Sequence, residues 1–422
     1  MTRTPLLIVS DSPNGSTGLG MVTGEIAKRA NESLSDVFDI AVAGYGDDNS
    51  GRQPFKVYPF IQRGDYVIPE LPRIWRRFAG DREGIIMSIG NISWLGRFAY
   101  PELIQDGQYH EFRDFVMSGR FKHWAYVPID SENLNGKLSN DETLILKRLD
   151  RILAYTKYGA DVIDRTLARP EGTTQYLPHG TDAKMFYPRD KKSARESLLG
   201  RIGFGVSAVI SDDVIIVGIF ATNTARKDWP LALKVCGILV DRGYNIGVIL
   251  HTDRMKGEWN IKELCHLCGL EGRVFESTKP LPKEDVAWLY AACDVVLANG
   301  RGEGWGLPIT ESLAMGVPVV HGNYAGGPEN MPKEWTVEPI GYQVETFWGN
   351  KRPVFKSEDW AAKVEEIWLT RNEPRKSFLK PELYWDQAWP AWEKWFRKGM
   401  EVSNLPSVRD IELVSRMPNV LL

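Results

Sequence analysis

Two glutamates stand eight residues apart in the stretch "GEGWGLPITESLAMGVPVV", residues 302–320. An apolar run ending at Asn299 precedes it, and Pro308 occupies a position where a helix can begin. The glycines allow the backbone to come close to a ligand, and free N–H groups at a helix start favour a phosphate. Glu303 on the loop and Glu311, which the pattern puts in the first helical turn, can accept hydrogen bonds from sugar hydroxyls. The stretch therefore predicts a sugar-phosphate site.

The same residues have a plainer interpretation. Glycine-rich strand-to-helix turns are common, and Glu311 can serve only as a favourable negative charge near a helix N-terminus. Glu303 would then be a solvated loop residue. The stretch alone does not decide between these two interpretations.

The size and composition of the chain indicate a two-domain globular protein. Its 422 residues exceed one ordinary core, so two domains of roughly 180–200 residues each are expected. With 43% hydrophobic residues, 25% charged residues and a net charge of −3, the chain has no overall attraction to nucleic acid or anionic lipid. It contains neither a run of about eighteen apolar residues nor a signal-peptide pattern. We therefore expect a cytoplasmic protein without integral membrane association.

The four cysteines do not suggest a disulfide framework. Cys265 and Cys268 flank His266 with a spacing found in zinc sites, but a second pair of ligands is missing nearby. We expect them to face a helical core and expect no metal site.

Short apolar runs alternate with amphipathic segments along most of the chain, which is typical of α/β domains with parallel sheets. Strands are predicted at 6–12, 38–46, 84–91, 123–130, 214–221, 245–253, 273–278, 294–300 and 317–322. A strand running into a helix is predicted at 151–166, and a strand and loop at 173–182. Helices are predicted at 18–33, 229–243, 261–269, 283–293 and 308–316. Residues 186–213 show little alternation and indicate a linker or a surface excursion between domains. Trp385, Trp389, Trp392 and Phe396 recur at a helical period and predict a packing face.

The Glu303-x7-Glu311 pattern followed by "GVPVV" resembles the donor-binding signature of family 4 glycosyltransferases, the glycosyl transferases group 1 of the GT-B fold. Three further segments resemble the family in the right order: "DSPNGSTGLGMVTGEIAK" at 11–28, "LPHGTDAKMFYP" at 177–188 and "IFATNTARKDWPLAL" at 219–233. The resemblance implies two tandem Rossmann-like doubly wound domains with the active site in the cleft between them.

The resemblance also implies domain boundaries. Residues 1–188 would bind the acceptor and residues 205–380 the nucleotide-sugar donor. Residues 381–422 would form a helical segment that packs back on the N-terminal domain.

The family assigns roles to the matching residues. Glu311 would bind the nucleotide ribose, Glu303 the donor sugar, and Arg226 and Lys227 the diphosphate, whose growing charge they would neutralise. Further donor contacts would come from the loop and its helix start and from the N-terminal glycine-rich loop: Gly304, Trp305, Gly306, Leu307, Gly18 and Gly20. For Arg226 and Lys227 the alternative is an ordinary charged helix surface.

The resemblance further implies a retaining transfer from a nucleotide-diphosphate sugar, with a UDP-sugar favoured. The chain has no Asp-x-Asp motif, the diphosphate-metal ligand of the other large glycosyltransferase fold. Basic side chains and a helix end can take the place of a metal, so we expect metal-independent transfer and no bound cofactor.

The acceptor side departs from the family pattern. Many relatives carry a histidine after an N-terminal-domain strand, but the comparable segment "MSIGNISWLG" has Asn91 and Trp94. Both are candidate acceptor-binding residues. Asp130 follows another predicted strand and could bind or deprotonate the acceptor hydroxyl. A turn or cap role for Asp130 is the alternative.

The segment "PRIWRRFAGDR" at 72–82 places arginines beside Trp75 and Phe78, a combination that suits phosphate-rich surfaces, or else forms a solvated helix face.

The opening "SDSPNGSTGLG" resembles a phage-associated branch of the family, which would work in the host cytoplasm. That favours a hydroxymethylated pyrimidine base in DNA as acceptor. A glycan or lipid-linked acceptor, with peripheral membrane contact, stays open. So do a nucleotide-sugar epimerase and a non-catalytic sugar-nucleotide-binding module.

Overall fold

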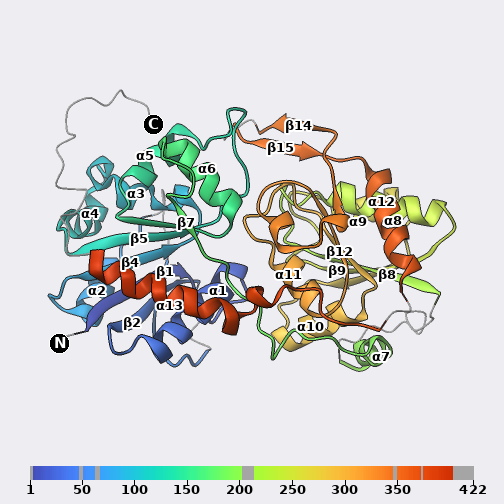
Figure 1. Cartoon of the computed structure of the whole chain (residues 1–422), viewed down its shortest axis with the longest axis horizontal. Helices are drawn as coiled ribbons and strands as arrows, with labels where there is room; N and C mark the ends of the chain where they lie inside the picture. The colour runs from blue at the N-terminus through green and yellow to red at the C-terminus, as the bar shows by residue number, and fades with distance from the viewer. Residues whose placement is uncertain are drawn as a thin grey trace. The chain divides into compact units, whose positions relative to one another are not determined.

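The structure is a computed structural model, and it describes residues 3–46, 51–61, 67–201, 213–345, 349–371 and 374–402. The chain divides into two compact units. Residues 1–127, 140–153 and 391–422 group in the first, and residues 128–139 and 154–390 in the second. The domain boundaries predicted from the sequence, at 188, 205 and 380, stay predictions. Figure 1 shows both units and labels most of their elements.

The first sheet has the strand order β3-β2-β1-β4-β5-β6-β7. Its strands are β1 (Thr4–Asp11), β2 (Phe38–Tyr45), β3 (Lys56–Phe60), β4 (Gly84–Ile89), β5 (Phe121–Val127), β6 (Arg151–Ala154) and β7 (Gln175–Tyr176). β1 pairs in parallel with β2 and β4, β2 with β3, and β4 with β5. The near-continuous apolar runs of β1, β2, β4 and β5 are buried, as expected for the centre of a parallel sheet covered on both faces.

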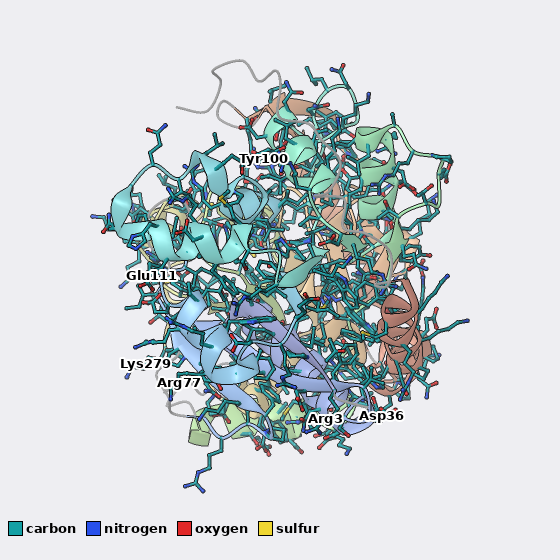
Figure 2. All side chains as sticks on the ribbon, turned by 90° about the vertical axis from the view of Figure 1, so that its left-hand side faces the viewer. Arg3, Asp36, Arg77, Tyr100, Glu111 and Lys279 are labelled. Atoms are coloured by element: carbon teal, nitrogen blue, oxygen red, sulfur yellow. The ribbon has the colours of Figure 1, made fainter. Side chains whose placement is uncertain are left out.

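The helices that alternate with these strands along the chain are α1 (Gly18–Ser33), α2 (Leu71–Ala79), α3 (Gly96–Ala99), α4 (His110–Met117), α5 (Asn140–Lys147) and α6 (Lys157–Leu167), and α6 belongs to the second unit. In α2, Trp75 is fully buried in the core, whereas Arg73, Arg76 and Arg77 are exposed. Figure 2 shows Arg77 at the surface. The prediction that Trp75 helps to form an aromatic-basic surface is therefore wrong, because the apolar face of this short helix is needed by the core.

Helix α13 (Trp385–Val402) buries an aromatic face, as the tryptophan spacing predicted. Within the first unit, the Trp392 ring meets Tyr126 edge-on at 4.7 Å between centroids, and Phe396 lies 6.1 Å from Phe38. The Arg151 guanidinium lies 3.9 Å from the centre of the Trp395 ring. Residues 403–422 lie outside the described part of the chain.

The second unit contains a six-stranded sheet in the order β10-β9-β8-β11-β12-β13. Its strands are β8 (Val214–Phe220), β9 (Asn245–His251), β10 (Val274–Ser277), β11 (Val295–Ala298), β12 (Val319–Gly322) and β13 (Thr336–Val337), and all pair in parallel. Its helices are α7 (Lys191–Arg201), α8 (Trp229–Asp241), α9 (Ile261–Leu267), α10 (Lys283–Ala292), α11 (Leu307–Ala314) and α12 (Ser357–Leu369). Helices α8 and α12 pack together beside this sheet (Figure 1).

Two features of the second unit differ from the sequence prediction. Residues 191–201 of the predicted linker form helix α7, whose Ala194 and Leu198 are buried. An antiparallel hairpin of β14 (Gly341–Val344) and β15 (Lys351–Val354) was not predicted, because its strands are short and mostly polar or exposed.

Cys265 belongs to the apolar core, and Cys268 packs against that core. Within the described residues, no helix has the length and apolarity that crossing a membrane requires.

Candidate functional site

Two loops at the carboxyl ends of neighbouring strands come together in the second unit. One loop follows β8 and carries Arg226 and Lys227; the other follows β11 and carries Glu303. The backbone N–H of Asp228 donates to the Asn299 carbonyl at 3.0 Å, and the N–H of Arg301 donates to the Arg226 carbonyl at 2.9 Å. Ligands of doubly wound folds bind at this end of the strands.

Glu303 is buried and forms ion pairs with both basic residues of the first loop. Its Oε2 lies 3.2 Å from Arg226 Nη1, and its Oε1 accepts from Lys227 Nζ. Burial raises the pKa of Glu303, but the charges of Lys227 and Arg226 outweigh burial and lower the pKa to about 2. Burial also lowers the pKa of Lys227. Glu303 is thus an ionised group that two cations hold in place.

Asp130 joins this cluster through Arg226. Its Oδ2 lies 3.3 Å from Arg226 Nε, and its Oδ1 lies 3.2 Å from Nη1 of Arg352 on β15. Arg352 Nε in turn lies 2.8 Å from Glu345 Oε1. The result is an alternating series of charges, called here the ion-pair chain: Glu345, Arg352, Asp130, Arg226, Glu303 and Lys227. The four residues predicted from the sequence as catalytic all belong to it.

The glycines of the second loop allow close backbone approach within the protein. Gly302 has a φ of +134°, and a Cβ there would collide with the carbonyl oxygen of Asp130. A Cβ on Gly304 would lie 2.7 Å from Cβ of Pro128. These glycines therefore let the segment 128–130 lie directly on the loop. The close approach of these glycines to a ligand stays a prediction.

Glu311 lies in the second turn of α11, not in the first as predicted. The helix begins at Leu307 because Gly306, with a φ of +87°, ends the loop as its N-cap. Glu311 is buried, and its Oε2 accepts a hydrogen bond of 3.0 Å from the hydroxyl of Tyr290. Burial raises the pKa of Glu311 to about 7, although the Tyr290 hydrogen bond opposes this shift.

Two polar side chains near the strand ends were missed in the sequence. Asn299 follows β11 and His321 lies on β12, and both are buried. His321 Nδ1 lies 2.5 Å from the Ala298 carbonyl, whereas its Nε2 and Asn299 Nδ2 have no hydrogen-bond partner among the described residues. The same holds for the buried indole N–H of Trp305. Only the position of Asn299 at a predicted strand end could have drawn attention to this group.

The predicted glycine-rich loop of the first unit ends where α1 begins, at Gly18. The Thr17 hydroxyl accepts from the N–H of Gly20 at 3.1 Å and donates to Asp11 Oδ2 at 2.7 Å. A Cβ on Gly20 would collide with the carbonyl oxygen of Ser12, so Gly20 has a packing role here. A role of Gly18 and Gly20 in donor binding stays a prediction.

Asn91 and Trp94 follow β4 in the first unit. Asn91 is exposed and precedes the short 3-10 helix Ile92–Leu95, and Trp94 lies against Gly90. Their role in acceptor binding is untested.

Residues 210–373, which include both loops, match the family model described as "Glycosyl transferases group 1". These residues form a glycosyl transferases group 1 domain. The group 1 domain covers 164 of the 422 residues, from 210 to 373, and contains five residues of the ion-pair chain.

Curated proteins resemble the chain over a similar length. It is 24% identical over 190 residues to the MMP alpha-(1->4)-mannosyltransferase of Mycolicibacterium hassiacum, which covers 44% of this chain and 40% of the relative. It is 26% identical over 204 residues to the D-inositol 3-phosphate glycosyltransferase of Xylanimonas cellulosilytica, covering 48% and 47%. Each match spans less than half of the relative.

Solved structures match nearly the whole chain. Sucrose-phosphate synthase from Thermosynechococcus elongatus superimposes with a TM-score of 0.68 at 14% identity, covering 95% of this chain and all of that structure. HepE of Anabaena, in complex with UDP and glucose, superimposes with a TM-score of 0.62 at 16% identity, covering 96% of this chain and all of that structure. The fold is GT-B, with two parallel-sheet α/β domains, as the sequence predicted. The predicted location of the active site between the domains stays a prediction.

Proposed function

We propose that the chain is a glycosyltransferase that moves a sugar from a nucleotide-diphosphate sugar to a hydroxyl acceptor. The observation that carries the proposal is the pairing of Arg226 and Lys227 with Glu303 at the strand ends of a group 1 domain. The two cations can balance the negative charge of a diphosphate. The buried carboxylate can accept hydrogen bonds from the hydroxyl groups of the donor sugar. The alternatives of an epimerase and of a non-catalytic module are tested below by product analysis.

On the donor side, Arg226 and Lys227 would exchange part of their contact with Glu303 for contact with the diphosphate. Glu303 would then accept hydrogen bonds from the sugar, and Glu311 from the ribose. Gly304, Trp305, Gly306 and Leu307 would supply backbone contacts, and Gly18 and Gly20 would close over the diphosphate. The structures of HepE with UDP and with UDP-glucose support a UDP-sugar as donor.

In the reaction, the bond between the sugar C1 and the diphosphate oxygen breaks, and a bond from C1 to the acceptor oxygen forms. The acceptor proton leaves to a diphosphate oxygen or to Asp130. Charge grows on the departing diphosphate, and Arg226 and Lys227 would stabilise it electrostatically. We propose that transfer retains the anomeric configuration and needs neither a metal nor a cofactor.

Both carboxylate oxygens of Asp130 face a guanidinium group. Each carboxylate oxygen can accept a further hydrogen bond while these contacts are kept. Orienting the acceptor hydroxyl by accepting a hydrogen bond is the easier role.

For the acceptor, the resemblance to the phage-associated branch favours a hydroxymethylated pyrimidine base in DNA. A specific observation favours a second class: the names of two similar proteins, D-inositol 3-phosphate glycosyltransferase and sucrose-phosphate synthase, indicate a small phosphorylated polyol or sugar. A lipid-linked acceptor is a third class. We therefore propose a hydroxyl acceptor and let the experiment choose its class.

The test is release of nucleoside diphosphate from UDP-, GDP- and ADP-sugars with each acceptor class present in turn. Hydroxymethylated duplex DNA, inositol and hexose phosphates, and a lipid-linked sugar would be compared, with and without a chelator. Product analysis separates transfer from epimerisation. If no combination releases nucleotide above hydrolysis and the donor sugar is unchanged, the transferase proposal fails.

A further inference from the structure

We propose that Arg352 is a positioning residue of the donor site: it keeps Asp130 paired when the donor diphosphate draws Arg226 away. The inference rests on the proposed function and extends it to the hairpin of β14 and β15. No motif of the family contains Arg352. Its ion pair with Asp130, within the ion-pair chain, is the observation that indicates this role.

Asp130 lies between two guanidinium groups that differ in their other partners. Arg226 also pairs with Glu303, at 3.2 Å, and donates to the carbonyl of Gly302. Arg352 pairs on its far side with Glu345, at 2.8 Å, and its side chain is only 7% exposed. Arg226 therefore stands next to the predicted sugar and diphosphate ligands, whereas Arg352 is fixed on the hairpin and faces Asp130 from the other side.

This arrangement matters when Arg226 binds a diphosphate. Asp130 would then share Arg226 with a strongly negative ligand and would repel that ligand across a partly buried site, where screening by water is weak. Arg352 compensates the charge of Asp130 independently of Arg226. Without Arg352, Asp130 would compete with the diphosphate for Arg226, and donor affinity would fall.

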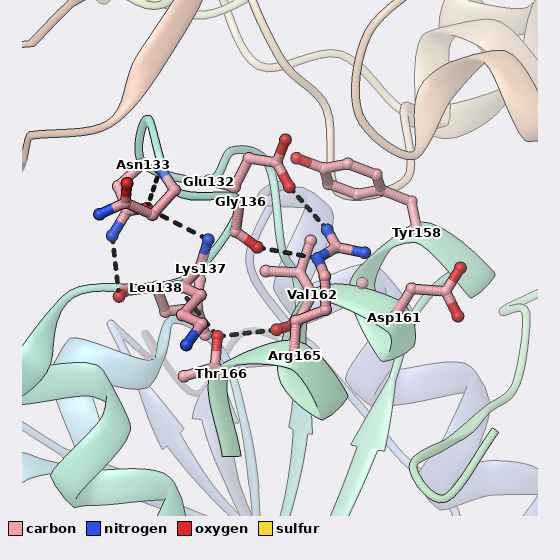
Figure 3. Close-up of polar contacts among 12 residues, drawn as sticks. Glu132, Asn133, Gly136, Lys137, Leu138, Tyr158, Asp161, Val162, Arg165 and Thr166 are labelled. Atoms are coloured by element: carbon pink, nitrogen blue, oxygen red, sulfur yellow. Dashed lines mark hydrogen bonds and ion pairs between the residues drawn. The ribbon is translucent and has the colours of Figure 1, made fainter. Parts of the chain in front are cut away.

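Arg352 Nη1 also donates to the backbone carbonyl of Asp130 at 3.2 Å, but the segment that carries Asp130 has further anchors. Figure 3 shows this segment against α6: Arg165 Nη2 lies 2.7 Å from Glu132 Oε2, and Arg165 Nε donates to the Gly136 carbonyl at 2.9 Å. The N–H of Leu138 donates to the Thr166 hydroxyl at 3.0 Å. Removing the Arg352 charge should therefore alter the electrostatics of Asp130 more than its location.

The hairpin also has an anchor of its own. Lys351 Nζ lies 2.6 Å from Glu132 Oε1, and the Lys351 carbonyl accepts from the Tyr324 hydroxyl at 2.9 Å. Lys351 is thus a matched control: it is the neighbour of Arg352 in β15 and pairs with the same segment, but it does not belong to the ion-pair chain.

The test is a double-mutant cycle on binding of UDP, GDP and ADP by the full chain, measured by calorimetry. For the nucleotide that the wild type binds best, R352Q is expected to weaken binding about tenfold, and R352K, which keeps the charge, by no more than about threefold. In a D130N background, R352Q should change affinity less than about twofold, because no charge is left to compensate. K351Q should bind as the wild type does. R352M serves as the uncharged variant if R352Q does not fold.

The outcomes separate the two proposals. If the wild type binds none of the three nucleotides, the proposed function fails, and this inference fails with it. If the wild type binds one and R352Q binds it equally well, only the role of Arg352 is overturned. An effect of R352Q that is equally large in the D130N background would also overturn it, because Arg352 would then act through packing and not through Asp130.

Discussion

The hydroxyl of Tyr290 donates a hydrogen bond to the buried carboxylate of Glu311 across 3.0 Å. The Tyr290 ring also stacks on Phe220 of β8, with 4.0 Å between ring centroids. The position of the Glu311 carboxylate is therefore fixed by Tyr290 of α10, whose ring packs on Phe220 of β8. The spacing of the two glutamates in the sequence could not predict these contacts.

The raised pKa of Glu311 predicts a pH-dependent donor affinity. The pKa is about 7 because the carboxyl group is buried. The ionised form is the better hydrogen-bond acceptor for ribose hydroxyls, so nucleotide affinity should rise as the pH increases from 6 to 8. Binding of UDP by calorimetry across this range checks it. In Glu311→Gln the pH dependence should be weaker than in the wild type, because only the ionisation of the UDP terminal phosphate, with a pKa of about 6, then contributes. The same slope in both proteins would contradict the assignment.

The same pKa makes a prediction for stability. The folded pKa of about 7 lies above the ordinary 4.5, so the folded state holds the proton more tightly than the unfolded state. The stability that this proton provides is complete below pH 4.5 and is lost as the pH rises through 7. The unfolding free energy of Glu311→Gln, compared with that of the wild type, should therefore increase by up to about 3 kcal/mol when the pH is raised from 5 to 8. Denaturant unfolding at both pH values measures the gain, and equal differences at the two pH values would refute it.

Replacing Glu303 should destabilise the protein strongly. Glu303→Gln removes the anion between Arg226 and Lys227 and leaves two cations in a mostly buried place. Breaking a buried ion pair from one side costs about 3–5 kcal/mol. We expect an unfolding free energy lower by about that amount, together with loss of transfer activity. Pyrophosphate should raise the melting temperature of this variant more than that of the wild type, because it replaces the missing anion. An equal rise in both would argue against these cations as the diphosphate site.

The close approach at Gly302 predicts a local cost for any side chain. Gly302→Ala would force a methyl group against the Asp130 carbonyl at a φ of +134° and should cost about 1–3 kcal/mol. Gly243→Ala is the control, since Gly243 has a φ of +87° but open space around its Cβ position. Because Gly302 adjoins the ion-pair chain, only Gly302→Ala should also reduce activity. If both variants lose activity equally, the contact with Asp130 has no special role.

The apolar and polar patterns of the sequence were sufficient for most of the fold. The central strands β1, β4, β8 and β11 are continuous apolar runs, and their burial follows from that. The hairpin of β14 and β15 and helix α7 could not be predicted in this way. Their residues are largely polar and are stabilised by contacts distant in sequence, such as Arg195 with Asp294 at 2.6 Å.

The site was predictable in its residues but not in its pairings. The motif spacing predicted that Glu303, Arg226 and Lys227 each contact a ligand. It did not predict that these side chains form ion pairs with one another. Asp130 was selected only because it follows a strand, and its contacts with Arg226 and Arg352 depend on tertiary structure. Arg352 lies in a hairpin without a recognisable motif, so no sequence signal pointed to it.

The central claim is that Arg226 and Lys227 bind the diphosphate of a sugar nucleotide. The most direct measurement is nucleotide release from UDP-sugars by Arg226→Ala, with Arg254→Ala as control, since Arg254 is an exposed arginine of the same domain. We predict that Arg226→Ala lowers kcat/KM by at least about a hundredfold, corresponding to about 3 kcal/mol of transition-state stabilisation, while Arg254→Ala stays within about twofold of the wild type. Equal activity of the two variants would contradict the account.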